Sequence, residues 1–533
     1  MHWADVVAVN LSRRGGKQII STGITPSGEF HIGHLREILT GEMISRAAID
    51  AGLDVEFIFI VDDADPLRRV YPFLADEYHE FIGHQIGNIP APDGAGKPDY
   101  ERFANEGFSY ADYFLNPFLD ALKAIGVNPR IVKNLAAYRS GKFTECIKTA
   151  CDNADKIRDI IERVSGRELP SNWFPWSPLD ANGSLEGVTV TGYEYPLVHF
   201  TDSAGNNGSS DITLGLGKLP WRIDWPAKWA WIGVTCEAFG KDHGASGGSY
   251  DTGKEICQLF GYEAPQPLVY EWISLKGKGA MSSSTGNTIG PMEALELVPP
   301  EILRFLIAGS KPNKAIEFDA GMSLVNLADD YERSCARDIA AELDDETLSR
   351  RRKVQLEDLM GAVRLSSVGH NSNTDSSNVS FRHLALLAQT KTDDAQVWHS
   401  LSMDENNPPS SVLIDRLKKM RTWINSPHFP DEMRIKIIDE PPLELLGDLS
   451  DDDGLVLANL TRMLNDCKWD VEAIATCIVE SAKTIEKSPR IAYTVAYTCL
   501  MGSKKGPKLA PIIAELDKPK VIRQFERCLD CLN

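Results

Sequence analysis

Several features that would set the chain apart from ordinary globular proteins are missing. The ten cysteines are scattered and the first is Cys146, so the sequence offers no disulfide framework. No run of eighteen apolar residues occurs, which excludes a predicted membrane span. The first residues, MHWADVVAVNLSRRGG, lack the apolar core of a secretory signal. We therefore expect a cytoplasmic protein.

Positive charge is also scarce. The 56 Lys and Arg residues face 76 Asp and Glu residues, which gives a formal net charge of −20. This balance argues against indiscriminate binding of nucleic acid. It does not exclude a nucleic-acid substrate, because such binding depends on local patches. Basic clusters at 350–353, 418–419 and 502–508 are each typical of a solvated face, and together they are compatible with a bound RNA.

The most informative stretch present is TPSGEFHIGHLREIL, at residues 25–39. A β-rich run, KQIISTGI at 17–24, precedes it and ends at the Pro-Ser-Gly turn. From Leu35 to about Ala51 apolar residues recur at helical spacing. Three residues fall at the junction of turn and helix: His31, Gly33 and His34. Free N–H groups and the positive end of the helix dipole favour anions at such a junction.

A second strand, VEFIFIVDDAD, begins at Val55. Its nearly continuous apolar run is typical of a parallel strand that is buried on both faces. A strand–helix–strand unit that opens with a glycine-containing turn predicts a doubly wound nucleotide-binding sheet, with the ligand at the carboxyl ends of the strands. Asp62, Asp63 and Asp65 lie at that edge, where they either hold substrate or simply form the turn.

The pattern along the whole chain predicts an α/β fold. We expect a doubly wound parallel Rossmann-type catalytic sheet with an inserted α/β subdomain, followed by all-α C-terminal domains. The predicted parts are a first half of the sheet domain, an insertion, a second half and a helical region, at 1–65, 66–215, 216–320 and 321–533. At 533 residues the chain is too long for one ordinary domain.

Four tryptophans fall within eleven positions near the start of the second half, Trp221, Trp225, Trp229 and Trp231. Core packing is expected for most of them. One of them is a candidate aromatic wall for an aliphatic side chain.

A second chemical motif is WISLKGKGAMSSSTGNTIG, at 272–290. Three consecutive serines between glycines predict a mobile loop whose hydroxyl and amide groups can hold phosphate oxygens, and Lys276 and Lys278 supply positive charge nearby. Attack of a carboxylate on the α-phosphorus of ATP needs positioning and preorganised donors but no protein nucleophile. Histidines at a helix start, facing such a loop, meet that need.

The two motifs together resemble HIGH and KMSKS, the signatures of the class I aminoacyl-tRNA synthetases. HIGH occurs literally at 31–34, and the second signature appears as AMSSS at 280–284. The resemblance narrows to the class I type of lysyl-tRNA synthetase. Blocks similar to that family run from about residue 17 to the end, with gaps in the insertion and around 345–470: TGITPSGEFHIGHLREILTGEMI, IDWPAKWAWIGVTCEAFGKDH, GGSYDTG, MSSSTGN, LVPPEILRFLIAGSKPNKAIEFD and AYTVAYTCLMGSKKGPKLAPIIAELDKPKVI.

The resemblance implies a lysine–tRNA ligase. Such an enzyme forms lysyl-adenylate from L-lysine and ATP, which enters with Mg²⁺, and then esterifies tRNA(Lys). The helical C-terminal part would form the stem-contact and anticodon-binding region, and relatives typically need the tRNA before they activate the amino acid. We expect a monomer that binds no membrane.

Site residues are carried over from the family position by position. The ATP-binding set is Pro26, Ser27, Gly28, His31, Gly33, His34, Asp242 and Met281. The catalytic set is His31, His34, Lys278, Ser282, Ser283 and Ser284, with the serines in the closing loop. The lysine-pocket set is Gly23, Thr25, Trp229, His243 and Tyr270, of which Trp229 and Tyr270 fit a core position equally well.

The lysine pocket must also pair the ε-ammonium group, because a desolvated unpaired cation is expensive. Asp224, Glu237 and the acids at 62–65 are the candidates, and the sequence leaves the choice open.

The sequence departs from the family's pattern in two places. Ala280 replaces the first lysine of the second signature, and Thr285 follows the serines, so Lys278 or Lys276 is expected to supply the missing charge. The insertion stretches NIPAPDGAGKPDY and WFPWSPLDANGS hold no cysteine, whereas relatives often carry Cys/His clusters there that suggest structural zinc. We predict no metal site: the insertion folds without zinc, and the lone C-x-x-C at 528–531 falls on a helix.

Three other functions stay open. A class I synthetase for glutamate, cysteine or arginine is one, although KPNKAIEFD and GKDH argue against it. A same-fold nucleotidyltransferase without tRNA would be much shorter and would leave the helical C-terminal region unexplained. A catalytically impaired tRNA-binding paralogue is suggested by Ala280, whereas the intact histidines and serines of the two signatures argue for an enzyme.

Overall fold

The computed structural model describes residues 1–276, 279–280, 289–369 and 376–532, and its chain divides into two compact units. The first unit consists of Met1–Leu295, Pro300–Asp319 and Arg337–Asp375. The second unit consists of Glu296–Pro299, Ala320–Ala336 and Ser376–Asn533. The predicted domain boundary at residue 320 stays a prediction. In the division into compact units, the described residues 337–369 belong to the first unit.

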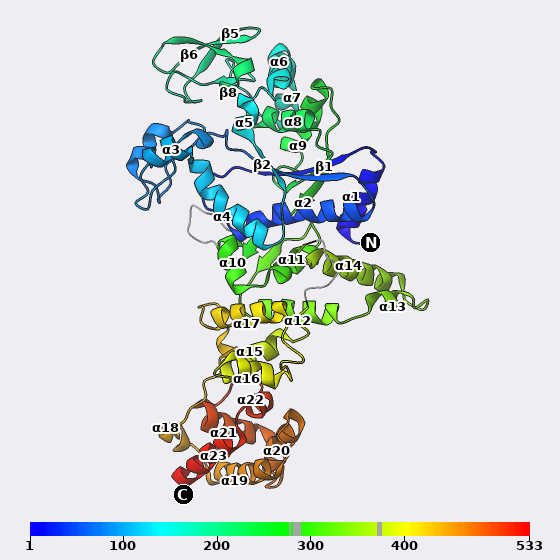
Figure 1. Cartoon of the computed structure of the whole chain (residues 1–533), viewed down its shortest axis with the longest axis vertical. Helices are drawn as coiled ribbons and strands as arrows, with labels where there is room; N and C mark the ends of the chain where they lie inside the picture. Colours follow the sequence, from blue (N-terminus) through cyan, green and yellow to red (C-terminus); the bar gives the residue numbers. More distant parts are fainter. Residues whose placement is uncertain (277–278, 281–288, 370–375, 533) are drawn as a thin grey trace. The chain divides into compact units, whose positions relative to one another are not determined.

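A five-stranded parallel sheet forms the centre of the first unit, with β1 and β2 labelled in Figure 1. Its strand order is β10-β9-β1-β2-β3. Its strands are β1 (Gln18–Ile24), β2 (Val55–Val61), β3 (Arg130–Lys133), β9 (Cys236–Gly240) and β10 (Gln266–Tyr270). The last four residues of β2 are at most 1% exposed, as expected for a strand covered on both faces. The sheet confirms the predicted doubly wound α/β fold.

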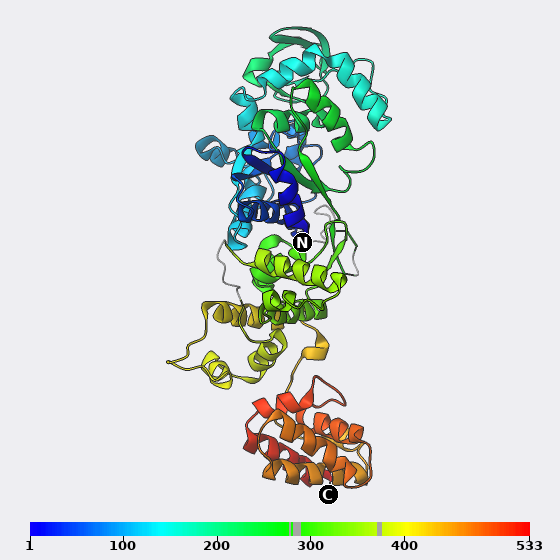
Figure 2. The same ribbon diagram turned by 90° about the vertical axis from the view of Figure 1, so that its right-hand side faces the viewer.

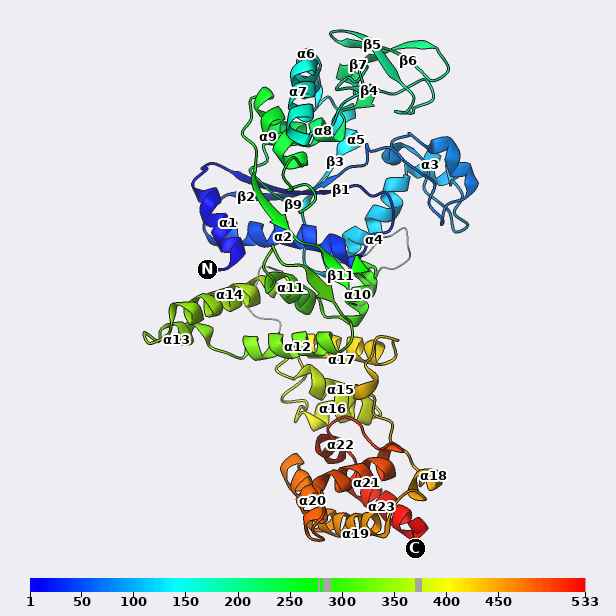
Figure 3. The same ribbon diagram turned by 180° about the vertical axis from the view of Figure 1, so that it is seen from behind.

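Helices cover both faces of this sheet. Figures 1 and 3 show α1 (Trp3–Ser12) and α2 (Ile32–Asp50) along one face, and α8 (Trp221–Ile232) and α9 (Ser249–Leu259) along the other. Gly41 lets α2 approach the sheet closely. A Cβ atom at this position would lie 2.6 Å from Cγ2 of Thr22 and 2.9 Å from Cε2 of Phe57, so a larger residue would push the helix away.

The insertion between β2 and α8 combines short helices with a small antiparallel sheet, β5-β6-β7. Its helices are α3 (Tyr100–Glu106), α4 (Tyr110–Ala124), α5 (Asn134–Arg139), α6 (Thr144–Asp152) and α7 (Ala154–Ser165), with 3₁₀ turns at Asp76–Phe81, Ile86–Asn88 and Ile212–Leu214. Its strands besides β3 are β4 (Ser177–Pro178), β5 (Thr189–Glu194), β6 (Leu197–Thr201), β7 (Asn207–Asp211) and β8 (Gly217–Lys218). The insertion therefore contains both helices and strands, as expected for an inserted α/β subdomain.

Three loops of the insertion share one hydrogen-bond pattern around Asp93, Asp180 and Asp202. In each loop, Oδ1 of the aspartate accepts from the backbone N–H groups two and four residues further on, at 2.8–2.9 Å. The glycine three residues after each aspartate has a φ of 79°, 91° or 86°, which glycine adopts without steric penalty. Two of these loops lie in the stretches expected to fold without zinc, which stays a prediction. Among the described residues, no group of three or more His, Cys, Asp or Glu is placed to hold a metal ion.

The remainder of the first unit contacts α2 through α11 and β11. It contains the three-stranded sheet β12-β11-β13, whose strands are β11 (Ile273–Leu275), β12 (Gly279–Ala280) and β13 (Ile316–Phe318). Its helices in the described part of the chain are α11 (Pro300–Ala308), α13 (Ile339–Leu343), α14 (Arg350–Ser366) and the first five residues of α10 (Pro291–Leu297). Arg304 on α11 is fully buried; its Nη2 pairs with Oε2 of Glu42 on α2 at 2.7 Å, and its guanidinium donates to the carbonyl of Leu365 on α14. This arginine ties three helices together.

The second unit is helical, as predicted. Its helices are α12 (Met322–Cys335), α15 (Phe381–Thr390), α16 (Asp394–Ser400), α17 (Ser411–Ile424), α18 (Leu443–Leu446), α19 (Asp451–Asp466), α20 (Val471–Lys483), α21 (Pro489–Met501), α22 (Leu509–Glu515) and α23 (Lys518–Leu532), with a 3₁₀ turn at Asp431–Met433. The helices from α19 onward share one apolar core (orange and red in Figure 2). None of the helices in the described part of the chain has the length and apolar character needed to cross a membrane.

Candidate active site

The two histidines of the HIGH stretch cap the start of α2. Nδ1 of His31 accepts from the backbone N–H of Gly33 at 3.1 Å, and Nδ1 of His34 accepts from the N–H of His31 at 3.0 Å. The helix begins at Ile32, three residues before the predicted start, because the histidine side chains satisfy N–H groups that would otherwise lack partners. Each neutral ring therefore carries its proton on Nε2, which remains as a donor.

Both histidines are neutral at pH 7. Burial lowers the pKa of His31 to about 4 and the pKa of His34 to about 3, and the neighbouring His31 ring adds to the second shift. The two ring centroids lie 4.0 Å apart. Two neutral Nε2–H donors thus stand side by side at the positive end of α2, a combination that suits phosphate oxygens.

A pocket opens at the carboxyl ends of β1, β2 and β9, the switch point where the sheet's strand order reverses. We call it the carboxylate pocket, and its lining residues are Gly23, Glu37, Ile60, Asp62, Trp221, Trp225, Lys228, Glu237, Phe239 and His243. The lining combines the aromatic rings of Trp221, Trp225 and Phe239 with three acids, Glu37, Asp62 and Glu237. The pocket is therefore suited to a ligand that has an aliphatic stem and positive charge.

Two acids in this pocket are held by neutral donors alone. Glu37 accepts from the N–H of Gly23 at 2.8 Å and from the hydroxyl of Tyr270 at 2.9 Å. Glu237 accepts from the indole N–H of Trp225 at 3.0 Å and from that of Trp229. Neither carboxylate forms an ion pair with any residue that the structure describes. Burial raises the pKa of Glu37 to about 8 and also raises the pKa of Glu237.

The other acids of the site belong to a chain of buried ion pairs, which we call the ion chain: Asp62, Lys228, Asp224, Lys218 and Asp65. Nζ of Lys228 contacts Asp62 and lies 2.9 Å from Oδ2 of Asp224. Nζ of Lys218 lies 3.7 Å from Oδ1 of Asp224 and 2.9 Å from Oδ1 of Asp65. Burial disfavours the charge on Lys228, but the carboxylates of Asp224 and Asp62 outweigh it and raise its pKa.

The ion chain narrows the choice of the acid that pairs with the ε-ammonium group of lysine, which the sequence left open. Asp224 and Asp62 already have lysine partners within the protein, and Asp63 accepts from the backbone N–H of Leu135 at 2.7 Å. Of the acids considered, Glu237 is the one in the carboxylate pocket that forms no ion pair with a described residue, although the charge of Lys228 acts on it from the same pocket.

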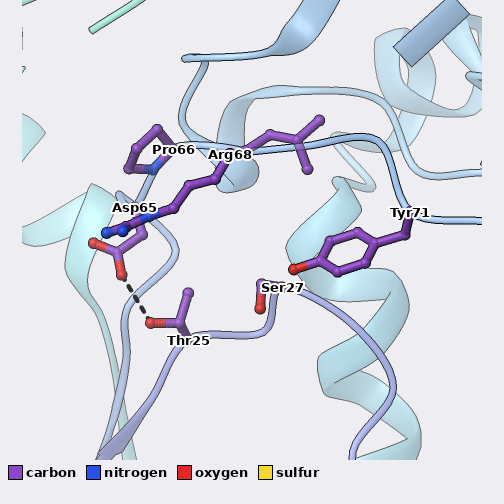
Figure 4. A pocket seen from close by; sticks show the side chains of 7 residues that line it. Thr25, Ser27, Asp65, Pro66, Arg68 and Tyr71 are labelled. Carbon is purple, nitrogen blue, oxygen red and sulfur yellow. Dashed lines mark hydrogen bonds between the residues drawn. The ribbon is translucent and has the colours of Figure 1, made fainter. Parts of the chain in front are cut away.

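A second cavity lies beside the Pro-Ser-Gly turn. We call it the turn cavity; it has a volume of about 190 Å³ and is lined by Thr25, Ser27, Asp65, Pro66, Leu67, Arg68 and Tyr71 (Figure 4). The hydroxyl of Thr25 donates to Oδ2 of Asp65 at 2.8 Å. Asp65 thus joins this cavity to the ion chain.

The predicted lysine-pocket residues lie at two places, the carboxylate pocket and the turn cavity. Gly23 and His243 line the carboxylate pocket, and Trp229 and Tyr270 are buried donors to its two free acids. Thr25 lines the turn cavity instead.

The predicted nucleotide residues are only partly described. Asp242 lies beside His243, with 3.6 Å between its Oδ2 and the imidazole Nε2. Lys276 pairs with Asp319 at 3.0 Å. Five residues of the prediction lie outside the described residues: Lys278, Met281, Ser282, Ser283 and Ser284.

Sequence reasoning missed Glu37. The available signal was helical spacing, because Glu37 lies three residues after His34 and four before Gly41, the glycine at which the helix meets the sheet.

Comparison with known proteins decides the family. The model of the tRNA synthetases class I (K) matches residues 1–359. The chain belongs to this family. The class I (K) tRNA synthetases are the group that the HIGH and AMSSS stretches predicted, so the resemblance is confirmed.

Individual relatives cover nearly the whole chain. A protein named lysine–tRNA ligase from Thermoplasma volcanium is 37% identical over 533 residues, which is 99% of each chain. Another of the same name from Thermoplasma acidophilum is 37% identical over 97% of each chain. A solved glutamate tRNA ligase from Elizabethkingia meningosepticum, in complex with its amino acid, is 16% identical and covers 97% of this chain and all of its own, with a TM-score of 0.42.

Proposed function

We propose that the protein is a lysine–tRNA ligase that activates L-lysine with ATP and transfers it to the 3′ end of tRNA(Lys). The family and its similarly long relatives named lysine–tRNA ligase support the assignment. The observation that carries it is the carboxylate pocket, where two acids form no ion pair with a described residue and share the lining with aromatic side chains.

L-Lysine fits the chemistry of this pocket. It carries two ammonium groups on an aliphatic stem, and Glu37 and Glu237 offer two carboxylates. A buried carboxylate regains its charge when an ammonium group arrives, because the opposite charge offsets the loss of hydration. We assign Gly23, Trp229, His243 and Tyr270 to the walls and supports of this pocket. Thr25 stays a candidate from its place on the neighbouring side.

ATP is assigned to the N-terminus of α2, where it enters with Mg²⁺ on its phosphates. The lysine carboxylate oxygen bonds to the α-phosphorus, the bond from that phosphorus to the pyrophosphate oxygen breaks, and pyrophosphate leaves with the electron pair. The Nε2–H groups of His31 and His34 and the helix dipole stabilise the charge that develops on the phosphoryl oxygens. The turn residues 26–28, with Gly33, Asp242 and the AMSSS loop, complete the assigned nucleotide site, and we expect a monomer to suffice.

ATP–pyrophosphate exchange tests the proposal, run with each of several amino acids and with and without tRNA(Lys). We expect exchange that depends on lysine, and lysyl-tRNA formation when tRNA is present. Exchange that responds to glutamate, cysteine or arginine instead would assign the protein to another specificity. Binding of tRNA without exchange for any amino acid would identify an impaired paralogue.

A further inference from the structure

Four cysteines of the helical second unit form two pairs of contacting thiols, which amino-acid activation does not use. Cys467 directly follows α19, and its thiol is hydrogen-bonded to that of Cys477 on α20. The thiols of Cys499 on α21 and Cys528 on α23 are hydrogen-bonded to each other. All four are free cysteines in this structure. Each pair therefore holds two oxidisable sulfur atoms side by side.

The two pairs differ in their access to solvent. Cys467 is partly exposed, whereas Cys477 is buried. Cys499 and Cys528 are both 0% exposed within the apolar core of the bundle. A reagent in solution can therefore reach one sulfur of the first pair and neither sulfur of the second. We call Cys467 and Cys477 the outer pair, and Cys499 and Cys528 the inner pair.

The surroundings of the outer pair favour a thiolate on Cys467. The ammonium group of Lys518 donates to the carbonyl oxygen of Cys467 at 3.0 Å, which places a positive charge beside the pair. Burial and the hydrogen bond with Cys467 raise the pKa of Cys477 to about 11. Cys477 thus keeps its proton and donates it in that hydrogen bond. A nearby cation and a hydrogen-bond donor both stabilise a thiolate, which is the nucleophilic form of cysteine.

The turn that begins at Cys467 is held against the last helices of the bundle. The indole N–H of Trp469 donates to the carbonyl oxygen of Leu516 at 3.0 Å, and the ammonium group of Lys518 lies 5.5 Å from the centroid of the Trp469 ring. Asp470 is the N-cap of α20. These contacts fix both ends of the turn, so the two sulfurs of the outer pair meet without a large movement of the backbone.

We propose that the outer pair is an oxidation site, at which a hydroperoxide oxidises Cys467 and a disulfide with Cys477 then forms. This inference goes beyond the proposed function and does not depend on it. Transient disulfides between an exposed and a resolving cysteine are typical of redox-sensing sites, whereas fully buried thiols are inert.

The oxidation proceeds in two steps. The Cys467 thiolate attacks the terminal oxygen of the hydroperoxide, the O–O bond breaks, and the alkoxide that leaves takes a proton from water. The sulfur of Cys477 then attacks the sulfur of the sulfenic acid formed on Cys467, the S–O bond breaks, and hydroxide leaves as water with the Cys477 proton. Two thiols are thus oxidised to one disulfide, and the peroxide bond is reduced.

Disulfide mapping after peroxide treatment tests the proposal on the full chain. All proteins carry Cys531→Ser, which removes the exposed thiol at the end of α23. Each protein is treated with hydrogen peroxide, its remaining thiols are blocked with N-ethylmaleimide, and its peptides are analysed by mass spectrometry. We expect a disulfide between Cys467 and Cys477 that dithiothreitol reverses. The inner pair serves as the control in the same molecule and should keep both thiols.

The disulfide should also be visible in the stability of the protein. It links two positions that are ten residues apart, which restricts the unfolded chain. We expect peroxide to raise the midpoint of thermal unfolding, and dithiothreitol to restore the original value. Cys477→Ser should show no such rise.

Two variants separate the attacking sulfur from the resolving sulfur. In Cys477→Ser the sulfenic acid on Cys467 has no partner, so its labelling by dimedone should rise about tenfold above that of the parent protein. The matched variant Cys499→Ser changes the inner pair and should form the outer disulfide at the parent rate. Dimedone labelling of Cys467 in the parent protein without a disulfide would overturn the proposal. No oxidation of Cys467, or equally fast oxidation of the inner pair, would overturn it too.

Discussion

Two groups of buried acids lie within a few residues of each other in the active site, and they differ in what neutralises them. The ion chain alternates three aspartates with two lysines, so its charges are compensated inside the protein. Glu37 and Glu237 are held only by backbone, hydroxyl and indole donors. The charges of the first group are balanced within the protein, whereas the second group has carboxyl groups that a cationic ligand can pair with.

The cost of burial explains why the difference matters. A carboxylate that is removed from water without a cation is strongly disfavoured, and it responds by a rise in its pKa. Glu37 shows that response, with a pKa of about 8. Asp224 is more deeply buried than Glu37, but Lys218 and Lys228 outweigh the effect of burial and lower its pKa. The same substitution of acid by amide should therefore have opposite effects in the two groups.

The largest expected effect is on the ion chain. Asp224→Asn removes the carboxylate that both lysines share, and it leaves two buried ammonium groups with one aspartate each. We expect the free energy of unfolding to fall by about 3–5 kcal/mol, as in other buried pairs that lose one partner. Denaturant unfolding followed by circular dichroism measures it.

The matched control is Glu106→Gln, which breaks the exposed pair between Arg102 and Glu106. This change should alter the free energy of unfolding by less than about 0.5 kcal/mol. An equally small change for Asp224→Asn would show that the ion chain does not stabilise the fold.

The next largest effect is on ligand affinity. Glu237→Gln keeps an oxygen that accepts from the Trp225 indole but removes the negative charge. We expect the Kd for L-lysine to rise about 100-fold, because a buried partner of an ammonium group is lost. Isothermal titration calorimetry gives the Kd, and an unchanged value in a folded variant would remove Glu237 from the lysine pocket.

Glu37→Gln is expected to raise the free energy of unfolding slightly, the opposite of the effect of Asp224→Asn. Because its pKa is raised in the folded state, the folded protein holds a proton that the unfolded chain loses above a pH of about 4.5. The free energy of unfolding of the wild type therefore falls at Glu37 as the pH rises from about 4.5 to 8. The amide of Glu37→Gln does not titrate, so the variant lacks this contribution. We expect Glu37→Gln to be more stable than the wild type by about 1 kcal/mol at pH 8.

The pH dependence supplies the check on this third prediction. Thermal unfolding of both proteins should show the advantage of Glu37→Gln shrinking toward pH 5. A variant that is less stable than the wild type at pH 8 would mean that Glu37 has a cation partner in the folded protein.

The sequence predicted the parts of this site that depend on neighbours along the chain. The strand, turn and helix at 17–51 and the buried strand after Val55 follow from turn residues, helical spacing and an apolar run. It could not predict which acids are neutralised, because the deciding contacts are distant in sequence: Lys228 and Asp62 are 166 residues apart. Glu37 was missed for the same reason, since Tyr270, its hydroxyl donor, lies 233 residues further on.

Proton release on lysine binding tests most directly whether the two unpaired acids await a cation. L-Lysine is titrated calorimetrically into the wild type at pH 7 in two buffers with different heats of ionisation. Glu37, with a pKa of about 8, is protonated before binding and ionises when the ammonium group arrives, so we expect close to one proton released per lysine and none from Glu37→Gln. Equal binding enthalpies in the two buffers for the wild type would contradict this assignment of the pocket.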